Sequence, residues 1–299
     1  MSTALLATAL GKRYGTEWAL RDFNVQVPAG RIVALVGPNG AGKTTLMNIA
    51  VGLLAPTVGE IKVFGWSPRD QPLLALSRVG FVAQDRPLYR QLSVAETMRM
   101  GRELNPRWDQ PAVATRLHRL EIPFDRKVGE LSGGQAAQVS LALAIGKRPD
   151  LLLLDEPIVN LDPLARREFL RELVAAVASD GLTAILSSHV VSELERVCDY
   201  LIVVANGRVR VMGDIDDLLG SHRLLVGPRI DPHLVTDDDT VINHEHSQFE
   251  SALLIKTNGH APPSQWRVHN VSLEDLVLAY MVNSRAGSLP KPTVAEIST

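Results

Sequence analysis

Short apolar runs separated by polar turns open the chain. Residues 5–10, 23–27 and 32–36 are mostly apolar, and segments rich in polar residues or glycine divide them. Runs of this length between turn residues predict β-strands. The first run has no basic residues before it and leads into Lys12 and Arg13, so we interpret it as a strand and not as a signal peptide.

The same kind of run recurs along the chain, at residues 59–63, 79–82, 151–154, 183–187, 200–204 and 208–212. Between them, residues 88–147 change to helical spacing, with apolar positions set among charged residues. We interpret this block as an inserted helical subdomain, at about residues 85–147. The last two runs flank Asn206 and Gly207, which predicts a hairpin.

A glycine-rich loop follows the strand predicted at 32–36. It consists of Gly37, Pro38, Asn39, Gly40, Ala41, Gly42, Lys43, Thr44 and Thr45. Its spacing, G-x-x-x-x-G-K-[ST], is that of a loop whose backbone N–H groups cradle a nucleotide phosphate. Lys43 supplies charge for the β- and γ-phosphates, and the Thr44 hydroxyl is a ligand for magnesium. The strand-to-helix context argues against a chance glycine-rich turn.

Two adjacent carboxylates, Asp155 and Glu156, end the fully apolar run Leu151–Leu154. A buried strand end is a costly place for charge unless a metal or a substrate lies nearby. We therefore expect this strand to run beside the phosphate loop. Asp155 would hold the magnesium, and Glu156 would face an attacking water as general base. The alternative is an N-capping pair ahead of a helix.

A helix is predicted to begin near Asp162 and Pro163. Its buried face is predicted at Leu170, Leu173, Val174 and Val177. His189 follows the next predicted strand. A lone histidine is usually structural, but one at the carboxyl edge of a parallel sheet is well placed to sense a terminal phosphate. Tyr14 would stack on a purine or serve as an ordinary turn residue, and its position alone favours the turn.

The composition changes after residue 220, where six of the eight histidines lie, together with an acidic run at 237–239 and prolines at 262–263. Runs at 224–226, 253–255 and 266–268 predict strands, and Ser272 with Asp275 predicts a capped helix start. We divide the chain into residues 1–220, a small C-terminal α+β accessory domain at 221–283 and a disordered tail at 284–299. His244 and His246 share a strand face without a third ligand, which indicates a solvated strand edge and not a metal site.

The overall composition excludes several classes. Of the 299 residues, 45% are hydrophobic and 21% are charged, as in an ordinary globular protein. A net charge of −2 gives no basic footprint for nucleic acid, so no such partner is expected. Cys198 is the single cysteine, which excludes an internal disulfide, suits a reducing cytosol and predicts a buried apolar role. No segment approaches the roughly 18 uninterrupted apolar residues of a membrane helix.

Five motifs occur in a fixed order: the phosphate loop, Gln84, the sequence LSGGQ, the sequence LLLLDE and a late histidine. The LSGGQ residues are Leu131, Ser132, Gly133, Gly134 and Gln135. Over residues 4–219 the chain therefore resembles the nucleotide-binding subunits of ATP-binding cassette (ABC) transporters, and LSGGQ is the most diagnostic motif. The resemblance implies an α/β fold: a phosphate-loop NTPase core with a mostly parallel sheet flanked by helices, an antiparallel β subdomain and the helical insertion.

The same resemblance implies an ATPase that uses ATP and Mg²⁺. It implies a head-to-tail dimer, with ATP held between Lys43 of one copy and residues 132–135 of a second. It also assigns the remaining roles: adenine stacking by Tyr14, a link between magnesium and the membrane-facing groove by Gln84, catalysis by Glu156, sensing by His189 and nucleotide binding by Asp162. The metal-binding set is then Thr44, Gln84 and Asp155.

The resemblance further implies a separate membrane permease, docked near residues 88–98, and a location at the cytoplasmic face of a bacterial membrane. The predicted C-terminal helix resembles that of exporter subunits, so we expect export. A soluble regulator of ribosomes or nucleic acid is the rival, but such proteins usually carry two cassettes or a long coiled coil. A scaffold that no longer hydrolyses ATP is a third possibility, because Ile158, Val159 and Asn160 depart from the usual sequence. Ala136 and Ala137 also depart, and we expect them to remove surface contacts.

Overall fold

The buried apolar runs form a six-stranded sheet at the centre of the chain. The structure is a computed structural model that describes residues 2–85, 87–228, 240–246, 250–257 and 265–282. In the central sheet the order is β5-β6-β7-β3-β8-β9, and only the β8–β9 pair is antiparallel. Its strands are β3 (Ile32–Val36), β5 (Val79–Val82), β6 (Leu151–Leu154), β7 (Thr183–Ser188), β8 (Tyr200–Ala205) and β9 (Arg208–Asp214). The predicted mostly parallel α/β core is confirmed.

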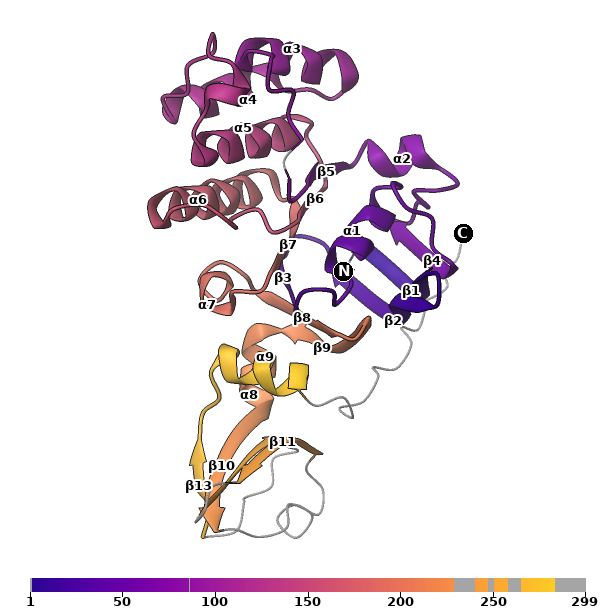
Figure 1. The fold of residues 1–299 in the computed structure, drawn as a ribbon, viewed down its shortest axis with the longest axis vertical. Helices are drawn as coiled ribbons and strands as arrows, with labels where there is room; N and C mark the ends of the chain where they lie inside the picture. The colour runs from indigo at the N-terminus through magenta and orange to yellow at the C-terminus, as the bar shows by residue number, and fades with distance from the viewer. Residues whose placement is uncertain (1, 86, 229–239, 247–249, 258–264, 283–299) are drawn as a thin grey trace.

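An antiparallel sheet of order β2-β1-β4 lies beside the central sheet (Figure 1). Its strands are β1 (Thr3–Tyr14), β2 (Glu17–Pro28) and β4 (Val58–Val63). Helix α1 (Lys43–Ala50) buries Leu46, Met47 and Ile49 in a core that also contains residues of β1, β2 and β3. The first apolar run is thus a strand, as predicted.

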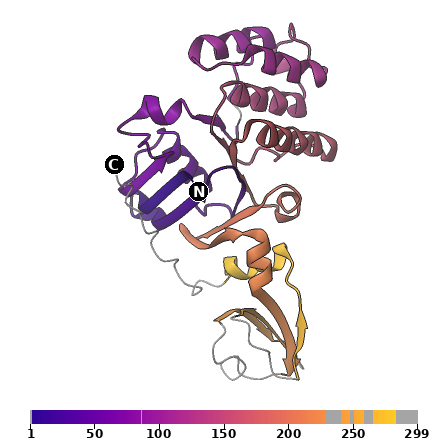
Figure 2. The ribbon, with the colours of Figure 1, turned by 180° about the vertical axis from the view of Figure 1, so that it is seen from behind.

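The inserted block is helical, as its spacing predicted. It contains α3 (Val94–Leu104), α4 (Gln110–Arg119), a 3₁₀ turn η1 (Val128–Glu130) and α5 (Gly133–Gly146). Ser93 and Glu96 form a capping box that starts α3. These helices gather at one end of the molecule next to α6 (Pro163–Asp180), and both views show this arrangement (Figure 2). Two further helices are short, α2 (Pro72–Leu76) and α7 (Val191–Leu194).

Strand β7 lies between β6 and β3, yet Glu156 at the end of β6 lies 3.5 Å from Lys43 of the phosphate loop, as expected of a strand that runs beside this loop. Two expectations about burial are wrong. Val174 is 36% exposed and does not belong to the buried face of α6, which is formed by Phe169, Leu170 and Leu173. Ala137 is fully buried, so it belongs to the core and not to a contact surface. Each outcome depends on long-range packing, which local spacing does not specify.

The C-terminal residues form a small sheet of order β11-β12-β10-β13 with helices at its base. Its elements are α8 (Ile215–Ser221), β10 (His222–Pro228), β11 (Thr240–His246), β12 (Glu250–Lys256), β13 (Arg267–His269) and α9 (Leu273–Val282). Ser272 caps α9 as predicted, since its hydroxyl accepts a bond from the Asp275 N–H. Helix α9 shares the core of the central sheet through Leu276, Val277 and Tyr280. The domain division at residue 220 remains a prediction.

Other predictions concern the same part of the chain. His244 and His246 lie on the edge strand β11, and the described residues hold no group of three potential metal ligands. The predicted tail, the acidic run and the paired prolines lie outside the described residues.

Cys198 is buried, as predicted, and burial raises the pKa of its thiol. Among the helices of the described ranges, none has the length and apolar character required to cross a membrane.

A buried histidine joins α8 and α9. His222 is fully buried; its Nδ1 lies 2.7 Å from the Leu218 carbonyl, and its Nε2 lies 2.9 Å from the Tyr280 hydroxyl. A carbonyl only accepts, so Nδ1 carries the proton and Nε2 accepts from Tyr280. Burial is the largest cause that lowers the pKa of His222 below its ordinary 6.5. The folded state therefore favours the neutral imidazole.

We expect the protein to lose stability as the pH falls below about 6.5, because the unfolded chain then binds a proton that folded His222 resists. The stability that comes from keeping His222 neutral is complete above about pH 6.5 and is lost progressively as the pH falls below that value. Thermal unfolding measured between pH 7.5 and 5.5 tests this. Each kcal/mol lost from the free energy of unfolding should lower the midpoint temperature by about 2–4 °C. His222→Gln should flatten the pH slope, whereas the exposed control His269→Gln should not. Equal slopes in the wild type and both variants would contradict the assignment.

Candidate functional site

The phosphate loop joins β3 to α1, as the sequence predicted. Gly40 and Gly42 have positive φ angles of 79° and 103°. A Cβ atom on Gly42 would lie 2.6 Å from the Ala19 carbonyl, and one on Gly37 would lie 2.2 Å from the Val204 carbonyl. Both positions therefore need glycine because the backbone packs closely there. The loop leaves the N-terminus of α1 open toward a pocket, which favours an anion.

This pocket has a volume of about 510 Å³, and we call it the phosphate pocket. Most of the predicted loop residues line it, together with Gln84, Glu156 and His189 from the ends of other strands. The lining residues are Ala19, Asn39, Gly40, Ala41, Gly42, Lys43, Thr44, Thr45, Gln84, Glu156, Val159 and His189. The fold thus brings together residues that lie up to 170 positions apart in sequence, from Ala19 to His189.

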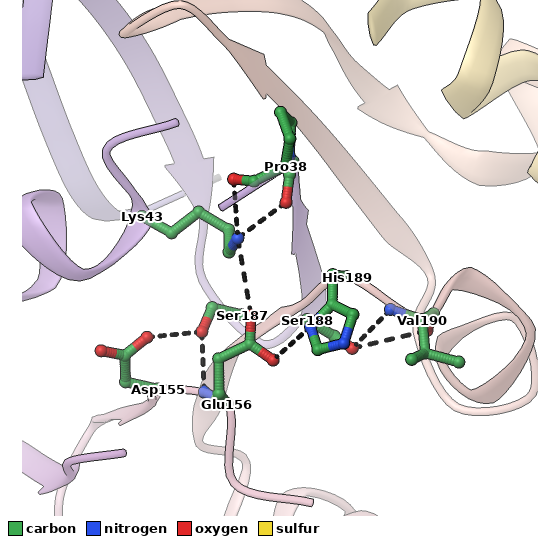
Figure 3. Close-up of polar contacts among 9 residues, drawn as sticks. Pro38, Lys43, Asp155, Glu156, Ser187, Ser188, His189 and Val190 are labelled. Atoms are coloured by element: carbon green, nitrogen blue, oxygen red, sulfur yellow. Dashed lines mark hydrogen bonds and ion pairs between the residues drawn. The ribbon is translucent and has the colours of Figure 1, made fainter. Parts of the chain in front are cut away.

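A buried cation and a buried carboxylate of the pocket lining lie in contact (Figure 3). Lys43 and Glu156 are each 6% exposed, and Lys43 Nζ lies 3.5 Å from Glu156 Oε1. The ammonium group also donates to the carbonyls of Gly37, at 2.7 Å, and Pro38, at 3.3 Å. These contacts hold the Lys43 charge in place, so a phosphate would meet a cation that is already oriented.

His189 continues the chain of polar contacts toward the pocket opening. Its Nδ1 lies 3.0 Å from Glu156 Oε2, and its side chain is about half exposed. Glu156 itself has a φ of 47°, a left-handed conformation that is unfavourable by roughly 1–2 kcal/mol for a residue with a side chain. Strain of this kind is concentrated at functional sites. Glu156 is therefore held between a cation and an imidazole that faces solvent.

Ser187 is a residue that the sequence analysis missed. Its hydroxyl donates to Asp155 Oδ1 at 2.7 Å and accepts from the Glu156 N–H at 2.8 Å. It lies on β7, which separates β6 from β3, so this serine holds the Asp155 carboxylate and the Glu156 backbone from the intervening strand. Its position at the carboxyl end of a predicted parallel strand was the available signal.

Asp155 and Asp162 lie apart from the pocket lining. Asp155 is 1% exposed, and its carboxylate accepts a hydrogen bond from the Ser187 hydroxyl. Asp162 is the N-cap of α6, where it accepts from the N–H groups of Leu164 and Ala165 at 3.0 Å each. The alternative in which Asp155 and Glu156 cap that helix is therefore wrong. Asn160 adopts a left-handed backbone conformation, with a φ of 65°.

The LSGGQ residues do not line the phosphate pocket of their own chain. Ser132 caps α5, where its hydroxyl accepts from the Gln135 N–H and the Gln135 side chain accepts from the Ser132 N–H. The first turn of α5 is exposed at Ser132 and Gly133.

Tyr14 is 51% exposed and does not line the phosphate pocket. The Lys12 Nζ atom lies over its ring, 5.3 Å from the ring centre. The roles predicted for these residues remain predictions.

Comparison with known proteins agrees with this geometry. The family model described as ABC transporter matches residues 20–159. The lantibiotic transport ATP-binding protein SrtF of Streptococcus pyogenes is 34% identical over 222 residues, which cover 69% of this chain and 89% of that protein. The Nod factor export ATP-binding protein I of Rhizobium johnstonii is 36% identical, covering 69% of this chain and 67% of that protein.

A protein named for import and a solved structure are also similar to this chain. The sulfate/thiosulfate import ATP-binding protein CysA of Pseudomonas aeruginosa is 34% identical, over 68% of this chain and 64% of that protein. A solved structure described as the ATP binding subunit of an ABC transporter superposes with a TM-score of 0.66 at 30% identity, covering 72% of this chain and 92% of that one. The family match, residues 20–159, ends before the small C-terminal sheet.

Proposed function

This chain belongs to the ATP-binding subunits of ABC transporters, and from that premise we propose that its phosphate pocket hydrolyses ATP to drive a separate membrane permease in export. The observation that carries the proposal is the convergence of Lys43, Glu156 and His189 on one pocket beside a phosphate loop. A cation, a carboxylate and an imidazole in this order suit the neutralisation of phosphate, the activation of water and the sensing of the terminal phosphate.

ATP supplies the phosphoryl group and Mg²⁺ neutralises its charge when they are bound. The oxygen donors fit this ion, which prefers one or two carboxylates with phosphate oxygens and water. Thr44 and Gln84 would hold it from the pocket wall, and Asp155 would act from behind, through water. Lys43 would move from the carbonyls of Gly37 and Pro38 toward the phosphates, which would free Glu156 to orient the attacking water.

A second copy of the chain would complete the site. The exposed N-terminal turn of α5, at Ser132 and Gly133, does not line this chain's own phosphate pocket, and the N-terminus of a helix favours an anion. In a head-to-tail dimer, residues 131–135 of one copy would cover the phosphates held by Lys43 of the other. Tyr14 would stack on the adenine, and Asp162 would lie at the dimer contact.

An apolar groove would receive the permease. It has a volume of about 410 Å³ and is lined by Val51, Leu53, Leu76, Val79, Gly80, Phe81, Val82, Ala83, Pro87, Leu88, Ser140, Leu143, Ala144 and Lys147. It lies between the central sheet and α5 and includes Leu88, at the start of the segment predicted to contact the permease. An amphipathic helix of the permease would bury its apolar face there, at the cytoplasmic face of the membrane.

Export is supported by the relative named for Nod factor export and by the resemblance of α9 to exporter subunits.

Photo-cross-linking in native membranes tests this proposal. A cross-linking side chain at Leu53, which is 68% exposed in the groove, should capture a multi-spanning membrane protein. The same side chain at Val268, on the distant strand β13, is the matched control and should not. Capture of ribosomal or nucleic-acid proteins from Leu53, with no membrane protein, would favour the soluble regulator instead. The identity of the captured permease would then point to the cargo.

A further inference from the structure

A pocket of about 670 Å³ lies between α6 and α7 and shares no residue with the phosphate pocket. Its volume falls within the range of about 300–1,000 Å³ that small-molecule sites occupy. Leu170, Val174 and Val197 form apolar parts of its wall. Helix α6 begins directly after Asp162, and α7 begins two residues after His189. We call it the arginine pocket.

Four guanidinium groups surround this apolar wall, at Arg166, Arg167, Arg171 and Arg196. Glu193 is the only carboxylate in the lining, and it is already paired with Arg166, which also donates to the Leu161 carbonyl at 3.1 Å. Within the described part of the chain, Arg167, Arg171 and Arg196 form no ion pair. The pocket therefore carries about three uncompensated positive charges in a chain whose net charge is −2.

Unpaired arginines beside apolar surface restrict the chemistry of a ligand. Guanidinium groups bind carboxylate and phosphate oxygens in a bidentate manner, and their positive potential favours anions over neutral or cationic molecules. The apolar wall also favours the burial of methylene groups, which inorganic phosphate does not have. A ligand that satisfies both features has an anionic head and an apolar body.

We propose that the arginine pocket binds an anionic amphiphile, a molecule with a phosphate or carboxylate head on an alkyl body. Arg167, Arg171 and Arg196 contact the head, and Leu170, Val174 and Val197 contact the alkyl chain. Arg166 is held by Glu193 and fixes the helix pair that forms the pocket. This proposal does not depend on ATP hydrolysis, because none of these residues belongs to the phosphate pocket.

Titration calorimetry on the full chain tests the proposal. The probes are octyl phosphate and octanoate below their critical micelle concentrations, with octyl glucoside, octyltrimethylammonium and inorganic phosphate as comparisons. The anionic probes should bind saturably and the comparisons should not, and the tighter of the two identifies the preferred head. Saturating ATP keeps the phosphate loop filled, and binding of octyl phosphate should persist under that condition. Loss of all binding in ATP would place the probe in the phosphate pocket and overturn the proposal.

Variants distinguish this pocket from general surface charge. Arg171→Gln with Arg196→Gln should weaken binding at least about tenfold, because each removed contact is a charge-assisted bond. Arg126→Gln, an exposed arginine in the helical insertion, should leave it unchanged. Val174→Trp should also weaken binding by filling the pocket without changing its charge. Equal affinity in all variants would overturn the proposal, as would binding of an acidic amphipathic peptide with no binding of either octyl probe, which would reassign the surface to a protein partner.

Discussion

Replacing Glu156 with glutamine is expected to preserve ATP binding and to lower ATP turnover by about 10²–10⁴-fold, the usual contribution of a positioned general base. The amide has nearly the same shape as the carboxylate, so it fills the same space between Lys43 and His189. It does not accept a proton from water at neutral pH. A steady-state phosphate-release assay measures the turnover, and equilibrium binding of a fluorescent ATP analogue measures the affinity.

The matched control is Glu195→Gln, a substitution of the same kind at an exposed position just after α7. Its turnover should remain near the wild-type value. Turnover of Glu156→Gln within a factor of two of wild type would remove Glu156 from its proposed role. A fall in ATP affinity equal to the fall in turnover would instead show that Glu156 acts in nucleotide binding.

Replacing Lys43 with alanine is expected to weaken ATP binding by about 10–100-fold, since charge-assisted bonds contribute roughly 1.5–3 kcal/mol each. The change also leaves Glu156, which is 6% exposed, without its buried cationic partner. Removal of one member of a buried pair is destabilising. We therefore expect a lower thermal midpoint in the absence of nucleotide, measured on the same preparations by differential scanning fluorimetry.

Two variants separate these effects. Lys62→Ala removes a partly exposed lysine that pairs with Glu60 on β4, and it should change neither ATP affinity nor stability. The double variant Lys43→Ala with Glu156→Gln should recover stability but not ATP affinity, because it removes the uncompensated carboxylate without restoring the cation. Wild-type affinity in Lys43→Ala would contradict the phosphate-loop assignment.

Local pattern identified most elements and most of the candidate site. The phosphate loop was predictable because strand, loop and helix start are contiguous, so the whole anion site forms within about fifteen residues. Ser93, Ser132, Asp162 and Ser272 all lie at helix starts, where the side chain bonds within its own first turn. The exposure of Val174 was not predictable in the same way, because it depends on which side of α6 faces the sheet.

By itself, the sequence determined the class of the fold, the phosphate loop, the carboxylate pair after β6 and the resemblance to ABC transporter subunits, because each depends on residues close together in the chain. Only the tertiary structure decided that β7 lies between β3 and β6 and that Ser187 therefore links Asp155 to Glu156. It likewise decided that arginines of α6 and Arg196, just after α7, share one pocket. Strand order and helix packing come from the burial of apolar surface between distant segments, and that burial is a property of the whole core.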